Sequence, residues 1–280
     1  MEDAQPSEAA APAAPEKPKE SWWDTIRFFL YLFVGALLLR TFVIAPFSIP
    51  SGSMLPTLMI GDYLFIAKWP YGYSHHSLPF GIGGFEGRVP SGLPDRGDVV
   101  VFRYPGPRNE DYVKRVIGLP GDTIEVRGGV VILNGAPAER RRIADYAMTI
   151  SPNSPCRGAP DAIRRVSGAD GGQLCLYPRY RETLPGGRSY DIIDQIPDGE
   201  ADDFGPIVVP EGRLFVMGDN RDDSMDSRFD ASREGVGLLP VENVLGEALV
   251  AFWSTDGSAE WAKPWTWFSA ARWSRVGGTY

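Results

Sequence analysis

The chain has 280 residues, of which 43% are hydrophobic and 23% charged, and its formal net charge is −8. This length allows one or two domains with a sizeable core. The negative net charge argues against nucleic acid as the main partner, because phosphate binding requires a basic surface. The 32 glycines and 25 prolines indicate turns and short strands rather than a helical bundle.

Residues 1–20 consist mostly of Ala, Pro, Glu and Lys and contain no aromatic residue. Such a segment buries too little to offset the entropy of ordering it, so we predict a disordered tail. Residues 21–47 follow as an apolar stretch that is long enough to cross a bilayer, which takes about 20 residues. Trp22 and Trp23 suit the headgroup region at its start.

Two alternatives to a transmembrane anchor over residues 21–47 are a buried core helix and a cleaved signal peptide. A soluble helix of this length normally keeps a polar face. The stretch also starts late for a signal peptide and has no clear cleavage site of small residues. We therefore predict a retained anchor.

Basic residues near the span predict its orientation. Lys17, Lys19 and Arg27 precede it, whereas Arg40 is followed by no basic residue until Lys68. Because positive residues favour the cytoplasmic side, we expect a cytoplasmic N-terminus and a body in the periplasm of a bacterium.

The chain after residue 47 has a β-type pattern, in which short apolar runs alternate with Gly, Pro and Asp. The predicted strand regions are 62–69, 98–104, 112–119, 123–135, 207–218 and 244–253. "RGGV" (127–130) is a candidate hairpin turn. The predicted fold is mostly β: an antiparallel β-sheet core with an inserted accessory β-rich domain, anchored by one N-terminal transmembrane helix.

The predicted domain division places the β core at 48–122 and 207–255 and the inserted accessory domain at 123–206. Within the insertion, residues 140–206 are polar and show few strand-like runs. Residues 256–280 form a Trp-rich basic tail that suits a membrane surface; a strap packed on the core is the alternative.

Cys156 and Cys175 are the only cysteines. They are able to form a disulfide if this part of the chain lies in an oxidising compartment. Two unpaired, buried thiols are the alternative.

The two histidines do not support a Ser-His triad. His75 and His76 are adjacent, and adjacent residues on a strand point to opposite faces. No His/Cys cluster has zinc-ligand spacing, so we predict no metal site. A serine hydrolase without histidine needs another base, and lysine serves when burial lowers its pKa.

Lys114 is the best candidate for such a base. In "DYVKRVIGLPGD" it shares one strand face with Tyr112 and Val116, so an aromatic and a β-branched side chain flank it. A solvent-exposed surface lysine is the alternative.

"IPSGSMLPTL" (49–58) is a candidate nucleophile turn. Gly52 allows the backbone to approach a substrate, and Ser51 and Ser53 offer one hydroxyl as nucleophile and one as an oxyanion donor. A plain turn is the alternative.

The acidic stretch "GDNRDDSMDSR" (218–228) is not an EF-hand. A loop starting at Asp222 has Ser227 where Gly is required and Arg233 where Glu is required. An Asx-rich turn with a surface ion pair is the alternative explanation.

Three stretches, "IPSGSMLPTLMIGDYLF", "GDVVVF…DYVKRVIGLPGD" and "MGDNRDDSMDSR", in this order after an anchor, resemble the conserved boxes of bacterial type I signal peptidases. The resemblance implies a membrane-bound serine endopeptidase that removes signal peptides from exported preproteins at A-x-A-type sites. It implies signal peptides and the phospholipid bilayer as partners and no cofactor. It also implies a place in the inner membrane with a periplasmic catalytic domain.

The resemblance also implies roles for single residues. Ser53 would be the nucleophile and Lys114 the general base. The Ser51 hydroxyl and the Ser53 N–H would form the oxyanion hole, and Ser224 would orient Lys114 through a hydrogen bond. The implied supporting residues are Asp219, Asp226 and Arg228, and the implied substrate-binding residues are Phe47, Ile49, Met54, Leu58, Tyr112 and Val113.

This chain departs from the family pattern at Asp223, where Asn is frequent, and at Met225, where a small residue is frequent. Two other functions fit the same features. One is a Ser-Lys peptidase dedicated to the maturation of one or a few substrates. The other is a membrane-anchored β-domain that binds envelope proteins without cleaving them.

Overall fold

The computed structural model describes residues 22–78, 87–158, 164–168, 171–260 and 262–280. The predicted disordered tail and Trp261 of the Trp-rich tail lie outside these ranges. The chain divides into two units, residues 1–38 and 39–280.

The first described element is the 21-residue helix α1 (Trp22–Phe42), which has apolar side chains around its whole circumference and charged residues only near its two ends. Many of its large side chains, among them Phe28, Leu30 and Phe33, are more than half exposed. At about 1.5 Å per residue the helix is about 30 Å long, which matches the hydrocarbon thickness of a bilayer. With a mean hydropathy of 1.6, α1 is long and apolar enough to cross a membrane.

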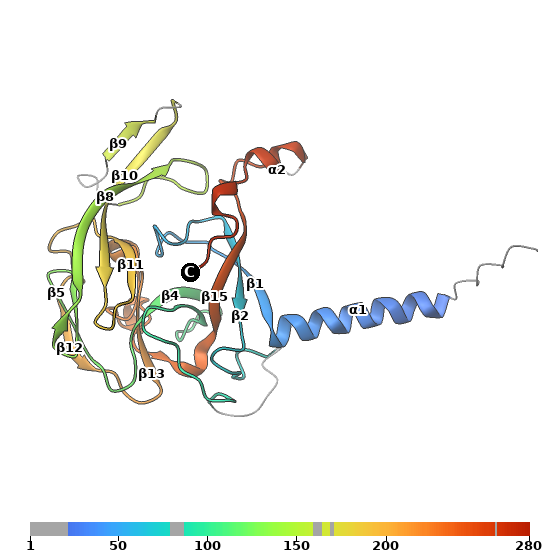
Figure 1. Cartoon of the computed structure of the whole chain (residues 1–280), viewed down its shortest axis with the longest axis horizontal. Helices are drawn as coiled ribbons and strands as arrows, with labels where there is room; N and C mark the ends of the chain where they lie inside the picture. The colour runs from blue at the N-terminus through green and yellow to red at the C-terminus, as the bar shows by residue number, and fades with distance from the viewer. Residues whose placement is uncertain (1–21, 79–86, 159–163, 169–170, 261) are drawn as a thin grey trace, which may run out of the picture. The chain divides into compact units, whose positions relative to one another are not determined.

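The main sheet has seven antiparallel strands in the order β1-β2-β15-β3-β4-β13-β14 (Figure 1). These strands are β1 (Ile44–Ser48), β2 (Asp62–Ala67), β3 (Val99–Arg103), β4 (Asp111–Gly118), β13 (Arg213–Met217), β14 (Leu239–Pro240) and β15 (Val244–Ser254). Strands β2, β3, β4, β13 and β15 confirm five of the six predicted strand regions, and the mostly β, antiparallel fold class is confirmed. The predicted end of the anchor at residue 47 was wrong, because α1 ends at Phe42 and residues 44–48 pair with β2 in the sheet.

The central strand β3 is buried on both faces, because apolar clusters lie on the two sides of the sheet. Val99 and Val101 pack against Ile49, Met54 and Leu58 from the stretch after β1. The register pairs Val100 with Lys114, so the lysine starts from the face of Val100, which is opposite to the face of Val99 and Val101 and is also buried. Val113 of β4 packs in the same cluster as Ile49, Met54 and Leu58, so the stretch after β1 also lies against β4.

A second sheet has the order β12-β5-β6-β7 and consists of β5 (Thr123–Arg127), β6 (Val130–Leu133), β7 (Ala136–Pro137) and β12 (Phe204–Val208). Its β5–β6 hairpin turns at Gly128 and Gly129, whose φ angles of 53° and 74° are in the left-handed region. A two-residue turn with positive φ at both positions favours glycine, so the hairpin predicted from "RGGV" is confirmed.

A third sheet consists of β8 (Glu139–Thr149), β9 (Arg164–Ser167), β10 (Gln173–Thr183) and β11 (Ser189–Ile193). The inserted region is β-rich, as predicted, but the sequence shows few strand-like runs in residues 140–206, so these strands were not located. The reason is that most side chains of β8 and β9 are exposed or half-buried on both faces, so the strands lack apolar alternation. Tyr177 and Ile193 of this sheet pack against Leu55, and the domain division at 123–206 stays a prediction.

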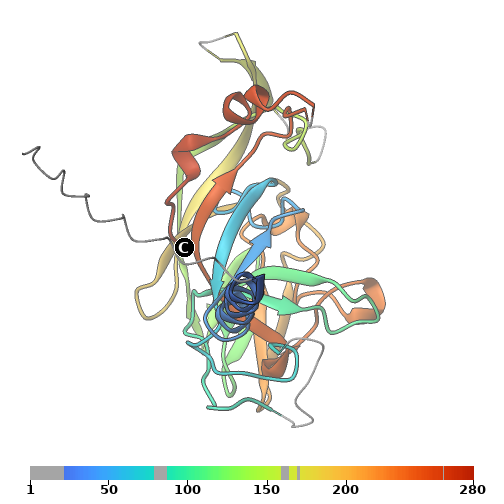
Figure 2. The same ribbon diagram turned by 90° about the vertical axis from the view of Figure 1, so that its right-hand side faces the viewer.

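The C-terminal residues contain the short helix α2 (Trp265–Ser269) and a 3-10 turn at Trp273–Arg275, after earlier 3-10 turns at Arg221–Asp223, Ala231–Arg233 and Val241–Asn243. The last residues run beside β15, since Gly277 N donates to Ala251 O at 2.8 Å (Figure 2). Trp265, Phe268 and Trp273 are between 55% and 69% exposed. The segment is therefore a strap on the sheet that also displays aromatic side chains.

Candidate active site

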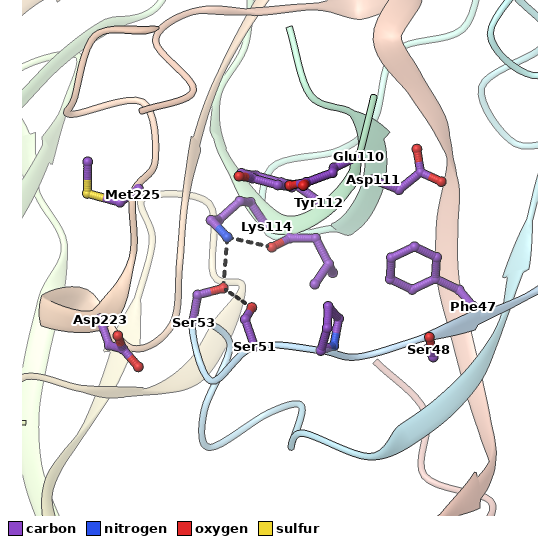
Figure 3. A pocket seen from close by; sticks show the side chains of 12 residues that line it. Phe47, Ser48, Ser51, Ser53, Glu110, Asp111, Tyr112, Lys114, Asp223 and Met225 are labelled. Atoms are coloured by element: carbon purple, nitrogen blue, oxygen red, sulfur yellow. Dashed lines mark hydrogen bonds between the residues drawn. The ribbon is translucent and has the colours of Figure 1, made fainter. Parts of the chain in front are cut away.

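Ser53 and Lys114 meet at the turn after β1 and the middle of β4 (Figure 3). Lys114 Nζ donates to Ser53 Oγ at 2.8 Å and to Val113 O at 2.9 Å. Ser53 is 6% exposed and Lys114 is 4% exposed. The structure thus places a buried amine within hydrogen-bond distance of a hydroxyl, although 61 positions separate the two residues.

Burial lowers the pKa of the Lys114 amine from its ordinary value of 10.5 to about 8. The carboxylates of Asp226, Asp219 and Asp223 act in the opposite direction and raise this pKa, but burial dominates. Within the described part of the chain, no carboxylate lies within ion-pair distance of Lys114. At pH 7 a minority of the amine is therefore neutral and able to accept a proton, and this minority is far larger than at the ordinary pKa of 10.5.

Asn220, which sequence reading missed, holds the nucleophile turn. Its backbone N–H donates to Ser53 O at 3.0 Å, and its Nδ2 donates to Gly52 O at 3.1 Å. The neighbouring Gly218 permits this approach, because a Cβ atom there would lie 2.3 Å from Ser224 Oγ and 2.5 Å from Ser53 O. In the sequence, Gly218 and Asn220 are the first and third residues of "GDN", the motif that begins the stretch 218–228.

Two donors flank the Ser53 hydroxyl. Ser51 Oγ lies 3.4 Å from Ser53 Oγ. No group in the described residues accepts a hydrogen bond from the Ser53 N–H. A hydroxyl and a free N–H beside a nucleophile are the groups that stabilise a tetrahedral oxyanion.

Ser224 is buried near this turn, but the predicted hydrogen bond to Lys114 is not formed. Among the described residues its Oγ has no well-formed hydrogen bond, although the hydroxyl lies close enough to Asp226 to stabilise that carboxylate. Lys114 Nζ instead directs its contacts to Ser53 and Val113 O. Hydrogen bonds of catalytic groups often tighten only when substrate is bound.

The predicted supporting residues form two buried ion pairs. Arg228 binds both oxygens of Asp226 at 2.9 Å, and Gly218 N also donates to this carboxylate. Arg115, directly after Lys114, binds Asp219 at 2.8 and 2.6 Å. These pairs fix the 218–228 loop to itself and to β4.

A cleft of about 530 Å³ opens beside Ser53 and Lys114. Phe47, Tyr112 and Val113 line it, as the resemblance implies. Sequence analysis did not assign six other lining residues to the cleft: Ser48, Pro50, Glu110, Asp111, Asp223 and Met225 (Figure 3).

Ile49, Met54 and Leu58 do not line the cleft. Each is at most 2% exposed and packs in the apolar cluster beneath the nucleophile turn. These three side chains are therefore part of the core. The expectation that they contact substrate does not agree with their burial.

The carboxylates of Asp194, Asp202 and Asp222 gather within 4.8 Å of one another. They already have protein partners, since Arg140 pairs with Asp194 at 2.6 Å and backbone N–H groups bind the other two. None of the three lines the cleft of Ser53.

A family model described as signal peptidase, peptidase S26 matches residues 22–253. The chain is 36% identical over 245 residues to signal peptidase I of Rickettsia akari (strain Hartford), covering 85% of this chain and 80% of that protein. It is 37% identical over 235 residues to signal peptidase I of Rickettsia typhi (strain ATCC VR-144 / Wilmington), covering 81% and 78%.

A crystal structure of a signal peptidase I from Enterococcus faecalis V583 is 24% identical and covers 55% of this chain and 96% of that one. Its TM-score of 0.28 is too low to support an argument. The family match and the relatives' identities show that the chain belongs to the signal peptidase I family of S26 peptidases, which are hydrolases.

Proposed function

We propose that this protein is a membrane-bound serine endopeptidase that removes N-terminal signal peptides from exported preproteins at A-x-A-type sites with a Ser53–Lys114 dyad. Its family supports the removal of signal peptides. The observation that carries the dyad is the 2.8 Å hydrogen bond between Lys114 Nζ and Ser53 Oγ in a buried position.

In the proposed acylation step, neutral Lys114 accepts the proton of Ser53 Oγ while this oxygen attacks the scissile carbonyl carbon. The negative charge moves to the carbonyl oxygen, which the Ser51 hydroxyl and the Ser53 N–H stabilise. When the C–N bond breaks, the Lys114 ammonium gives its proton to the leaving amine. The mature protein departs, and the signal peptide remains as an ester on Ser53.

In the proposed deacylation step, Lys114 is neutral again and accepts a proton from a water molecule that attacks the ester. The ammonium then returns this proton to Ser53 Oγ as the second tetrahedral intermediate collapses. The products are the free signal peptide and the starting enzyme, so one residue serves as base and acid in turn.

The preference for small residues follows from the cleft walls in this proposal. Phe47, Tyr112 and Val113 offer apolar surface, while Ile49, Met54 and Leu58 fill the space beneath. A shallow apolar surface over a filled core accepts small side chains and excludes large ones.

The proposed location is the inner membrane, with α1 as a single anchor, the N-terminus in the cytoplasm and the catalytic body in the periplasm. The length and apolarity of α1 support the anchor. The disulfide between Cys156 and Cys175 supports the periplasm, since such bonds persist in oxidising compartments. The exposed aromatic side chains of the C-terminal segment suit a lipid surface.

The short segment between α1 and Ser53 also keeps the proposed site near the bilayer. Ser53 is eleven positions after Phe42, the last residue of α1, and an extended chain spans about 3.5 Å per residue. The nucleophile therefore lies within about 40 Å of the end of the helix, whatever the angle between the two units.

The test compares detergent-solubilised wild type and Ser53→Ala on a preprotein, with the cut site mapped by mass spectrometry. We expect one cut after an A-x-A-type sequence in the wild type and none in Ser53→Ala. Ser167→Ala, which changes an exposed serine on β9, is the matched control and should cleave normally. Cleavage by Ser53→Ala at the wild-type rate would refute the proposal.

A panel of preproteins with unrelated signal sequences measures the breadth of the activity. A general signal peptidase cleaves most of the panel. Cleavage of only one or two members would instead support the dedicated maturation peptidase.

A further inference from the structure

The C-terminal strap holds the far end of the nucleophile turn. Arg275 Nη2 donates to Thr57 O at 2.9 Å, and Arg272 Nη2 donates to Ile60 O at 2.5 Å. Both carbonyls belong to the turn that begins at Ser53 and ends at β2. More than 200 positions of sequence separate the two partners of each contact.

Asp62, the first residue of β2, joins the strap and the turn at one carboxylate. It is fully buried, and Arg275 binds it through Nε at 2.9 Å and Nη2 at 2.6 Å. The same carboxylate accepts Met59 N at 2.8 Å and Ser254 Oγ at 2.6 Å. The end of the turn, strand β15 and the strap are therefore tied together where water is excluded.

The last residue extends this contact beneath the turn. Tyr280 packs against the apolar cluster that contains Ile49, Met54 and Leu58. The backbone of the strap is bonded to β15, with Ala251 N donating to Gly278 O at 2.9 Å. The strap therefore supports the turn from below as well as at its end.

Thr57 connects the strap to the strand of the lysine. Its carbonyl accepts Arg275, while its hydroxyl donates to Asp219 Oδ2 at 2.5 Å. Asp219 is paired with Arg115, the neighbour of Lys114 on β4. A continuous chain of hydrogen bonds thus links the C-terminal strap to the strand that carries Lys114.

We infer that Arg272 and Arg275 are positioning residues, which set the separation of Ser53 and Lys114 by holding the turn at Thr57, Ile60 and Asp62. This inference rests on the proposed Ser-Lys dyad. The geometry requires arginine at both positions. The Arg275 guanidinium binds the Asp62 carboxylate through two nitrogens and still reaches Thr57 O, and the Arg272 guanidinium donates to Ile60 O, Thr255 O and Ser254 Oγ at once. A lysine keeps the charge but is a point donor without this fork.

The test measures kcat, KM and the pH dependence of kcat/KM for Arg275→Lys and Arg272→Lys in the full chain, with a peptide of A-x-A type as substrate. We expect kcat to fall about 10- to 100-fold with KM within about twofold, because a displacement near 1 Å is enough for such a loss. A loosened turn also admits water to the amine, so the rise of kcat/KM should move to higher pH. Arg233→Lys, in an exposed pair with Glu200, is the matched control.

The pH profile separates positioning from stability. A lower kcat with the profile unchanged and a lowered melting temperature would show a structural role only and overturn the inference, as would wild-type kinetics in both variants. If Arg275→Lys does not fold, Arg272→Lys decides. Arg272 lies 3.6 Å from the buried Asp62 carboxylate, farther than Arg275 at 2.6 Å, so its substitution disturbs that carboxylate less. Cleavage by Lys114→Ala at the wild-type rate would refute the proposed dyad instead.

Discussion

A lysine acts as a base near neutral pH only when its ammonium form is disfavoured, and the surroundings of Lys114 do this by excluding water. Its amine lies between Ser53 Oγ and Val113 O, with no ion-paired carboxylate in the described structure. The nearby carboxylates of Asp226 and Asp219 are already bound by arginines, which limits how far they raise the pKa of the lysine.

The first prediction concerns the pH dependence of cleavage. Because the base must be neutral and burial lowers the pKa of Lys114 to about 8, kcat/KM should rise with pH and level off above about 8. The measurement is kcat/KM of the wild type between about pH 5 and pH 10. A profile that is flat over this range would argue against lysine as the base.

Asp223 gives a second prediction at this scale. Its carboxylate lines the cleft and raises the pKa of Lys114, so Asp223→Asn should lower that pKa. The rise of kcat/KM should then move to lower pH. Glu110→Gln, at another lining position that is not among the main groups acting on the pKa of Lys114, is the control and should move the midpoint less. A midpoint that stays in place in Asp223→Asn would contradict the electrostatic account.

Single elements show where sequence patterns were sufficient. Strands β2, β3 and β4 have apolar runs bounded by Asp, Gly and Pro, and each was predicted close to its observed ends. Strands β8 and β10 were missed, because neither has a clearly apolar face in sequence. They are stabilised by pairing with each other, which depends on a long-range register that a local pattern does not contain.

The sequence also predicted part of the candidate site and missed the residues whose contacts are long-range. Ser53 and Lys114 follow from the need for a base other than histidine and from the resemblance. Asn220 and Arg275 were not found, because their partners in the turn lie more than 160 positions away and exist only in the folded chain. Ile49 was assigned to the cleft because an apolar residue suits a pocket and a core equally well.

The pair Arg115–Asp219 gives the prediction for the elements that it joins, β4 and the 218–228 loop. Asp219→Ala leaves a buried guanidinium without its partner, so the free energy of unfolding should fall by about 3–5 kcal/mol. Urea denaturation measures it. The control is Glu200→Ala in an exposed pair, which should change it by less than about 1 kcal/mol. Equal effects of the two substitutions would contradict the assigned role.

At the scale of the whole molecule, buried carboxylates predict how stability depends on pH. Burial is the largest single effect and alone would raise the pKa values of Asp226 and Glu182. Arg228 and Arg221, together with hydrogen bonds from Gly218 N and Tyr190, outweigh it and hold both pKa values below their ordinary values of 3.8 and 4.5. A carboxyl with a lowered pKa in the folded state contributes stability above its unfolded pKa, and this is lost as pH falls through the folded value.

The free energy of unfolding should therefore be steady at neutral pH and decrease as pH falls below about 4. Urea denaturation of the wild type at several pH values measures this. Asp226→Asn removes one titrating group and should reduce the slope. Stability that increases on acidification would contradict the account.

The central claim is that Lys114 is the base for Ser53, and the cleavage rate of purified Lys114→Ala tests it most directly. Folding is checked by circular dichroism, and Lys263→Ala, in an exposed pair of the C-terminal segment, is the control. We predict that Lys114→Ala loses at least about a hundredfold in kcat/KM while Lys263→Ala cleaves like the wild type. A folded Lys114→Ala protein that removes a signal peptide at the wild-type rate would contradict the claim.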